Sequence, residues 1–294
     1  MLHYLYLRTA FEYRCENYRS VPLGRPRVVV LEIFGVILDR EFAVKRALST
    51  WLPFVGPGIP LDKIVSRYVE CEAFVARERA KSAMSLTMIV HDALVTLAKK
   101  LDVAHDACAK LVTSTLPIIL EPQPYPDVCD AVDALRGKGL TLIFLPPHSH
   151  ETLTYLPRVL PPTLLEHSVV SPTAPSIHFA SNAALWKSLH ELSASRLPGL
   201  REDEILVAST GIGRILAPAQ ERGLVTALVK RPGNREASVN FHVSPYAEAN
   251  PKPSVVVDSL SALSQVLKIQ CRGGVDAQQR RTHEALGPAS DSQR

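Results

Sequence analysis

This chain of 294 residues has few cysteines, no long apolar run and no large excess of one charge. The five cysteines are far apart, odd in number and form no Cys-x-x-Cys pair, which argues against a disulfide framework or a zinc site and favours a reducing, cytoplasmic compartment. No apolar run reaches the roughly 18 residues that a membrane span needs, so no membrane association is expected. A net charge of +4, without a long basic run, gives no support for a nucleic-acid partner.

Hydrophobic residues make up 46% of the chain, enough for a sizeable core. The run of β-branched residues that begins at Val28 does not alternate with polar residues, which predicts a strand buried on both faces, as in a parallel sheet. Helical segments separate it from later strand candidates, and this order predicts an α/β fold with a doubly wound, Rossmann-like parallel sheet. Those later candidates are residues 140–145, 168–170, 204–208, 225–229 and 254–257.

Between the first strand and the second, the sequence has only helical texture, which predicts an all-helical cap inserted after the first core strand. The expected domain organisation is an N-terminal extension, an α/β core in two pieces, a helical cap and a disordered tail. The extension is residues 1–24, the core is residues 25–40 and 119–270, the cap is residues 41–118, and the tail is residues 271–294. Asp127 is expected to cap the helix that follows the cap region.

From Arg25 to Leu267 the sequence resembles the haloacid-dehalogenase-like hydrolase superfamily, and within it the type II 2-haloacid dehalogenases. The stretches that carry the resemblance stand in the family's order, with the helical insertion directly after the first of them. They are Leu31–Asp39, Pro124–Val128, Ile205–Ser209, Lys230–Gly233 and Val255–Leu260. The resemblance implies hydrolysis of 2-haloacids or similar small carboxylic acids, in which a carboxylate forms a covalent ester that water then hydrolyses.

By this resemblance Glu32 stands at the nucleophile position, where the family has Asp. The extra methylene of Glu displaces the carboxylate oxygens by roughly 1 Å, and misplacement on that scale can cost about a hundredfold in rate. Phe34 stands two residues later, where phosphatases of the family carry a second Asp, and is expected to contact substrate. Val36 replaces the threonine of the motif and therefore removes a hydroxyl donor.

The other motif positions also depart from the family. Pro146 and Pro147 follow the second motif strand in place of a hydroxyl and an amide residue, which leaves Ser149 as the nearby candidate for substrate binding. Ser171 aligns with the third-motif lysine and is a second candidate substrate contact. In the fourth motif Ser209 is a candidate for orienting the attacking water, and Arg214 replaces an acidic residue. Arg214 is therefore a candidate substrate contact or an ion-pair partner of Glu32.

The sequence leaves two functions open. One is a hydrolase acting on a small carboxylic acid through Glu32. The other is a catalytically inactive pseudoenzyme that serves as a binding or interaction module, which the simultaneous changes at several motif positions favour. No cofactor and no metal site are expected, because the positions beyond Glu32 that hold magnesium in the family's phosphatases lack carboxylates. A small carboxylic acid and a second copy of the chain, in a homodimer, are the partners that stay open.

Overall fold

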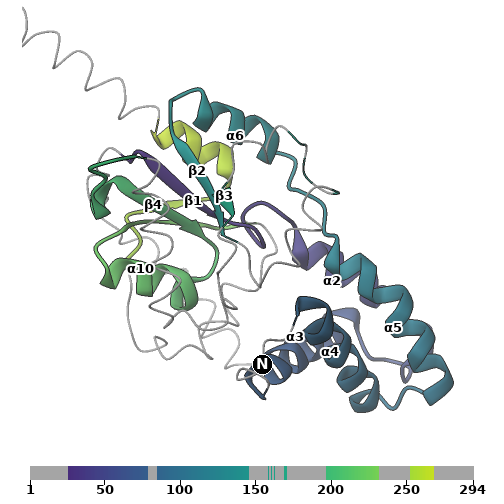
Figure 1. Ribbon diagram of the computed structural model, residues 1–294. Helices are drawn as coiled ribbons and strands as arrows, with labels where there is room; N and C mark the ends of the chain where they lie inside the picture. Colours follow the sequence, from purple (N-terminus) through teal and green to yellow (C-terminus); the bar gives the residue numbers. More distant parts are fainter. Residues whose placement is uncertain are drawn as a thin grey trace, which may run out of the picture.

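The computed structural model describes residues 26–78, 85–145, 158, 160, 162, 169–170, 197–231 and 252–267. Within these residues lies a six-stranded parallel sheet with the order β3-β2-β1-β4-β5-β6 (Figure 1). The expected doubly wound parallel sheet is therefore confirmed, with the first strand at its centre. The strands are β1 (Val28–Glu32), β2 (Thr141–Leu145), β3 (Val169–Val170), β4 (Ile205–Ser209), β5 (Val225–Val229) and β6 (Val255–Val257).

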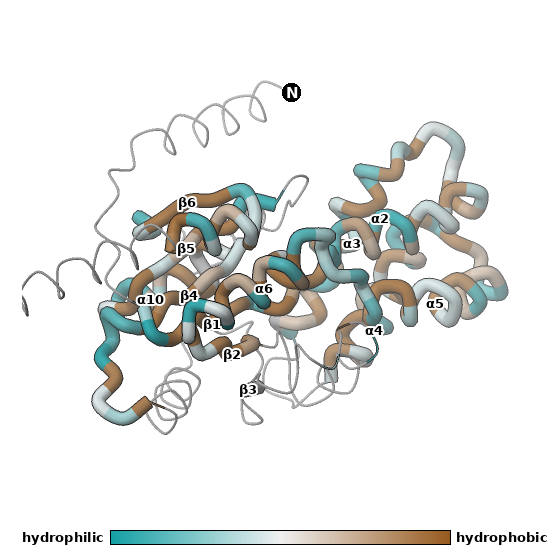
Figure 2. Tube along the Cα trace, turned by 90° about the horizontal axis from the view of Figure 1, so that it is seen from above, coloured by the Kyte–Doolittle hydropathy of each residue, from teal (hydrophilic) through white to brown (hydrophobic). Residues whose placement is uncertain are grey.

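Every residue of β1, β4 and β5 is buried, which explains why their sequences do not alternate. Side chains of a strand point alternately to its two faces, and both faces of this sheet are covered. Val29 and Leu31 belong to one hydrophobic cluster, whereas Val28 and Val30 belong to another. The helices of the core include α6 (Val128–Arg136), α10 (Ala217–Glu221) and the helix at 260–267. Brown, hydrophobic segments run through the sheet in Figure 2.

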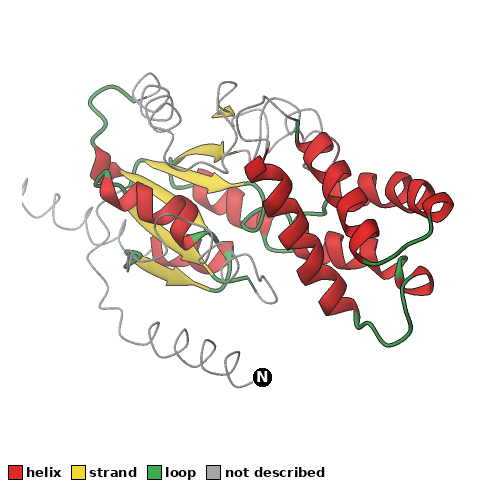
Figure 3. Cartoon of the chain, turned by 90° about the horizontal axis from the view of Figure 1, so that it is seen from below, coloured by secondary structure: helices red, strands yellow, loops and turns green. Residues whose placement is uncertain are grey.

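The described part of the chain between β1 and β2 is mostly helical, as expected for a cap. It contains α2 (Arg40–Ser49), the short 3-10 helix η1 (Leu52–Phe54), α3 (Leu61–Glu78), α4 (Leu86–Lys100) and α5 (His105–Leu120). These helices gather beyond the strands in Figure 3. Among the residues that the structure describes, no helix is both long and apolar enough to cross a bilayer. The domain boundaries stay a prediction, and the terminal segments 1–24 and 271–294 lie outside the described residues.

Asp127 differs from its expected role. It occupies the N-cap position of α6, but its side chain makes no capping hydrogen bond. Its Oδ1 instead accepts a hydrogen bond from Arg231 at 2.7 Å, and its Oδ2 accepts one from the backbone N–H of Ser261 at 3.1 Å. The expectation of a simple helix cap was therefore wrong, because a buried guanidinium competes for the carboxylate.

Two linkers join the core to the cap. The outgoing linker, residues 33–39, turns sharply at Gly35, whose φ of 90° is strained for residues with a Cβ. The returning linker, residues 121–127, runs beside it. The N–H of Asp39 donates to the carbonyl of Gln123 at 2.8 Å, and the N–H of Tyr125 donates to the carbonyl of Ile37 at 3.0 Å.

Candidate functional site

Glu32 and Ser209 meet at the carboxyl ends of two neighbouring strands. Glu32 is the last residue of β1, and Ser209 is the last residue of β4. The register between these strands pairs Leu31 with Ala208, so the next residue on each strand comes to the same edge of the sheet. In open α/β sheets this edge is where ligands and catalytic groups lie.

The Glu32 carboxylate is buried and held by donors from β4 and the residue after it. The side-chain hydroxyl of Ser209 donates to Oε2 of Glu32 at 2.6 Å. The backbone N–H of Thr210 donates to the same oxygen at 3.1 Å, and its hydroxyl lies 3.4 Å away. Glu32 is 1% exposed. Short hydrogen bonds to a carboxylate are stronger than those between neutral groups, so they fasten the end of β1 to the end of β4.

The proton of the Ser209 hydroxyl is already used in this arrangement. Its oxygen accepts the backbone N–H of Gly211 at 2.8 Å, while its only proton goes to Glu32. Gly211 leads into η3 (Ile212–Leu216), a single π-helical turn that carries the chain into α10. Ser209 is completely buried. In this arrangement it has no proton left with which to orient a water molecule.

Phe34 lies beneath a charged group from the cap. Its ring is buried, and the guanidinium carbon of Arg40 lies 5.3 Å from the ring centroid. Arg40 also forms an ion pair with Glu72 of α3. The buried Tyr68 lies close to this pair, and its pKa is raised well above the usual value by burial and by the charge of Glu72. Phe34 therefore contacts the cap, and its role in substrate binding remains a prediction.

The structure places only part of the predicted site. Ser149 and Ser171 lie outside the described residues, as do Pro146 and Pro147. Arg214 belongs to η3, but its side chain is not described, so the expected ion pair with Glu32 stays a prediction. Thr210 was missed by sequence reasoning. It directly follows Ser209, and a hydroxyl residue next to the end of a central strand was the available signal.

The donors around Oε2 of Glu32 do not suit a magnesium ion. Magnesium takes oxygen ligands and usually needs carboxylates, whereas the groups that face Oε2 of Glu32 are two hydroxyls and an N–H that point their protons at it. Within the described residues, no group of three or more His, Cys, Asp and Glu side chains is arranged to hold a metal ion.

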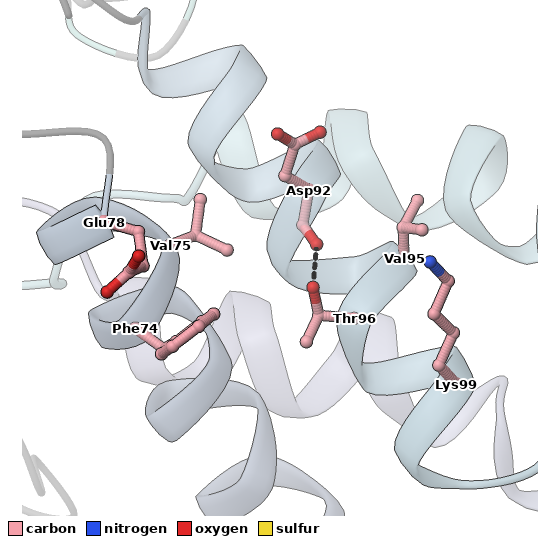
Figure 4. A pocket seen from close by; sticks show the side chains of 7 residues that line it. All are labelled: Phe74, Val75, Glu78, Asp92, Val95, Thr96 and Lys99. Carbon is pink, nitrogen blue, oxygen red and sulfur yellow. Dashed lines mark hydrogen bonds between the residues drawn. The ribbon is translucent and has the colours of Figure 1, made fainter.

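A groove in the cap lies apart from Glu32. It has a volume of about 310 Å³ and lies between α3 and α4 (Figure 4). The hydroxyl of Thr96 donates to the carbonyl of Asp92 at 2.7 Å, so this hydroxyl is already bonded within α4. Neither Glu32 nor Ser209 lines the groove. The groove is therefore a separate site from the carboxyl edge of the sheet. Its lining residues are Phe74, Val75, Glu78, Asp92, Val95, Thr96 and Lys99.

Comparison with known proteins gives a structural answer and no sequence-based one. Neither a protein-family model nor a curated protein matches the sequence. Among solved structures, the L-2-haloacid dehalogenase RSc1362 superposes with a TM-score of 0.61 at 17% identity, over 83% of this chain and 100% of that one. The L-2-haloacid dehalogenase of Xanthobacter autotrophicus with chloropropionic acid covalently bound gives 0.57 at 17% identity, over 83% and 98%.

A hydrolase of the same fold, YfnB from Bacillus subtilis bound to magnesium, superposes with a TM-score of 0.55 at 18% identity, over 83% of this chain and 99% of that one. Each of these matches covers 83% of this chain and nearly all of the other chain. At these identities the similarity concerns the fold and leaves the chemistry to be argued from the site. The chain has the fold of the haloacid-dehalogenase-like hydrolases, with a parallel α/β core and a helical cap inserted after its first strand.

Proposed function

We propose that this protein is a catalytically inactive member of the haloacid-dehalogenase-like hydrolases, and that it serves as a binding or interaction module. The observation that carries the proposal is the state of Glu32: it is 1% exposed, and Ser209 and Thr210 hold one of its oxygens. A nucleophile must approach the reacting carbon to about 3–3.5 Å, so it needs an open path to substrate. Burial of Glu32 supports a structural role in place of a nucleophilic one.

The sequence changes support the same proposal. Val36 and Pro146 remove donors that the family uses, and Ser171 removes a positive charge. Stabilisation of developing charge is commonly the largest contribution to catalysis, and loss of one such donor costs about 2.7–4 kcal/mol. Loss of several such groups together leaves a hydrolytic mechanism without its electrostatic support.

A second candidate function is hydrolysis of a 2-haloacid through Glu32. Its support is the place of Glu32 at the carboxyl end of the central strand, in a fold shared with a dehalogenase that is covalently bound to chloropropionic acid. In this case the carboxylate would attack the carbon that bears the halogen, halide would leave, and water would hydrolyse the resulting ester. The substrate would be a small carboxylic acid, and Phe34, Ser149, Ser171 and Arg214 would contact it.

The two functions differ in a direct assay of halide. We expect the wild-type protein to release no chloride from 2-chloropropionate above the uncatalysed background. Glu32→Asp alone is expected to remain inactive, because Pro146 still withholds a donor and Ser171 still lacks a charge. Chloride is measured by ion chromatography, with the Glu32→Gln variant as control. Turnover by the wild type that disappears in Glu32→Gln would refute the inactive role and establish the hydrolase.

Magnesium is expected not to bind specifically at this edge of the sheet. Phe34 stands where a second carboxylate would be needed, and the neighbours of Glu32 are proton donors. Titration with magnesium chloride to millimolar concentration, followed by calorimetry, should give no saturable heat. A one-site isotherm that is absent in Glu32→Ala would contradict this and reopen the interpretation of the protein as a phosphatase.

Location and partners form part of the same proposal. We place the protein in the cytoplasm, since its scattered cysteines fit a reducing compartment. A small carboxylic acid is the proposed ligand of the carboxyl edge, which follows from the resemblance in sequence motifs. A homodimer is the proposed assembly.

A further inference from the structure

Arg231 contacts both linkers that join the core to the cap. It lies two residues beyond the end of β5. One of its terminal nitrogens donates to the carbonyl of Val36 at 2.6 Å, on the outgoing linker. The other donates to the carboxylate of Asp127 at 2.7 Å, on the returning linker. A single guanidinium group therefore connects three segments that are far apart in the sequence.

The surroundings of Arg231 hold it in one orientation. Its side chain is 3% exposed, and its guanidinium carbon lies 4.1 Å from the centroid of the Tyr125 ring, which also belongs to the returning linker. Stacking on an aromatic face and bidentate hydrogen bonding both use the planar shape of the guanidinium. Asp127 is fixed in turn by the N–H of Ser261 at 3.1 Å. The contact is thus anchored on the core side.

We infer that Arg231 is a hinge clamp that fixes the orientation of the helical cap relative to the sheet. Between β1 and β2 the chain passes from core to cap and back through these two linkers, so the geometry of the linkers sets the position of the cap. Backbone hydrogen bonds join the linkers to each other, but contacts with the core are what fix the pair against the sheet. Ile33 bonds to Leu145 at the end of β2, and Asp127 bonds to Ser261. Arg231, just beyond β5, is the side chain that holds both linkers at once. The inference rests on the linkers alone and is independent of whether Glu32 is catalytic.

Distance measurements between core and cap test the inference. Spin labels are introduced as non-canonical residues at Phe54 of the cap and Glu202 of the core, both exposed, so that all native cysteines remain. In Arg231→Gln, the distribution of distances from pulsed electron paramagnetic resonance is expected to be at least twice as broad as in the wild type. Arg201→Gln serves as the matched control, because Arg201 pairs with Asp203 on the exposed surface of the core.

Hydrogen exchange separates hinge loosening from a general loss of stability. In Arg231→Gln the amides of Asp39 and Tyr125 are expected to exchange at least about tenfold faster, because local opening exposes only the linkers, while the amide of Val207 in β4 keeps its rate. Asp127→Asn is expected to act in the same direction, and Arg231→Lys replaces Arg231→Gln if the latter does not fold. Unchanged distances in the variants, or equal acceleration at Val207, would overturn the inference.

Discussion

Replacement of Glu32 by alanine is expected to lower the free energy of unfolding by about 4 kcal/mol, since the substitution leaves a cavity and buried donors without an acceptor. The donors are the hydroxyl of Ser209 and the N–H of Thr210, both buried at the end of β4. Glu32→Gln keeps the size of the side chain and one accepting oxygen, so its expected cost is smaller, about 1–2 kcal/mol. Urea unfolding followed by circular dichroism measures both.

The direction in which Glu32→Ala changes the free energy of unfolding separates the two candidate functions. Catalytic sites are often strained, so a substitution that removes a catalytic group is commonly neutral or stabilising. Removal of a carboxylate that has a structural role is instead expected to lower stability. An unchanged or raised stability in Glu32→Ala would contradict the structural role of Glu32 and favour its retention as a reactive group.

Asp127→Ala is expected to lower the free energy of unfolding about as much as Glu32→Ala does. The substitution leaves the guanidinium of Arg231 charged, buried and without its carboxylate partner. Loss of one member of a buried ion pair typically costs about 3–5 kcal/mol. Asp133→Ala on the same helix is the matched control, since the Asp133 side chain is 71% exposed and lies 3.8 Å from Arg136. The control is expected to cost less than about 1 kcal/mol, as exposed ion pairs usually do.

Thermal or urea unfolding of the two variants side by side measures the difference. Similar small losses in Asp127→Ala and Asp133→Ala would mean that the buried pair adds little to stability. The contacts of Asp127 with Arg231 and Ser261 would then not be a main source of stability.

The sheet could be predicted from sequence because its signal is local. Buried parallel strands need apolar side chains on both faces, and the runs beginning at Val28 and Val225 have that composition over their whole length. The predicted strand at 225–229 matches β5, and the strand predicted at 204–208 begins one residue later in β4. The helical cap was also predictable, because the sequence after the first strand has helical texture that no strand pattern interrupts, and α2 to α5 lie in this stretch.

The polar contacts could not be predicted in the same way, because their partners are distant in sequence. Glu32 and Ser209 are 177 residues apart, and Arg231 and Val36 are 195 residues apart. Local pattern places Glu32 and Ser209 at strand ends but does not show that they bond to each other. Asp127 was predicted as a helix cap for the same reason, because its partners Arg231 and Ser261 lie 104 and 134 residues further along the chain.

The claim that Glu32 has a structural role and is not a nucleophile is tested most directly by the incorporation of heavy oxygen from labelled water. During covalent hydrolysis, water attacks the ester on the nucleophile, so one oxygen of that carboxylate is replaced in each cycle. The wild-type protein is incubated with 2-chloropropionate in water enriched in oxygen-18, and the peptide that contains Glu32 is then analysed by mass spectrometry. The proposal predicts no gain in mass at Glu32. A gain of one or two heavy oxygens on this side chain, dependent on the substrate, would contradict it.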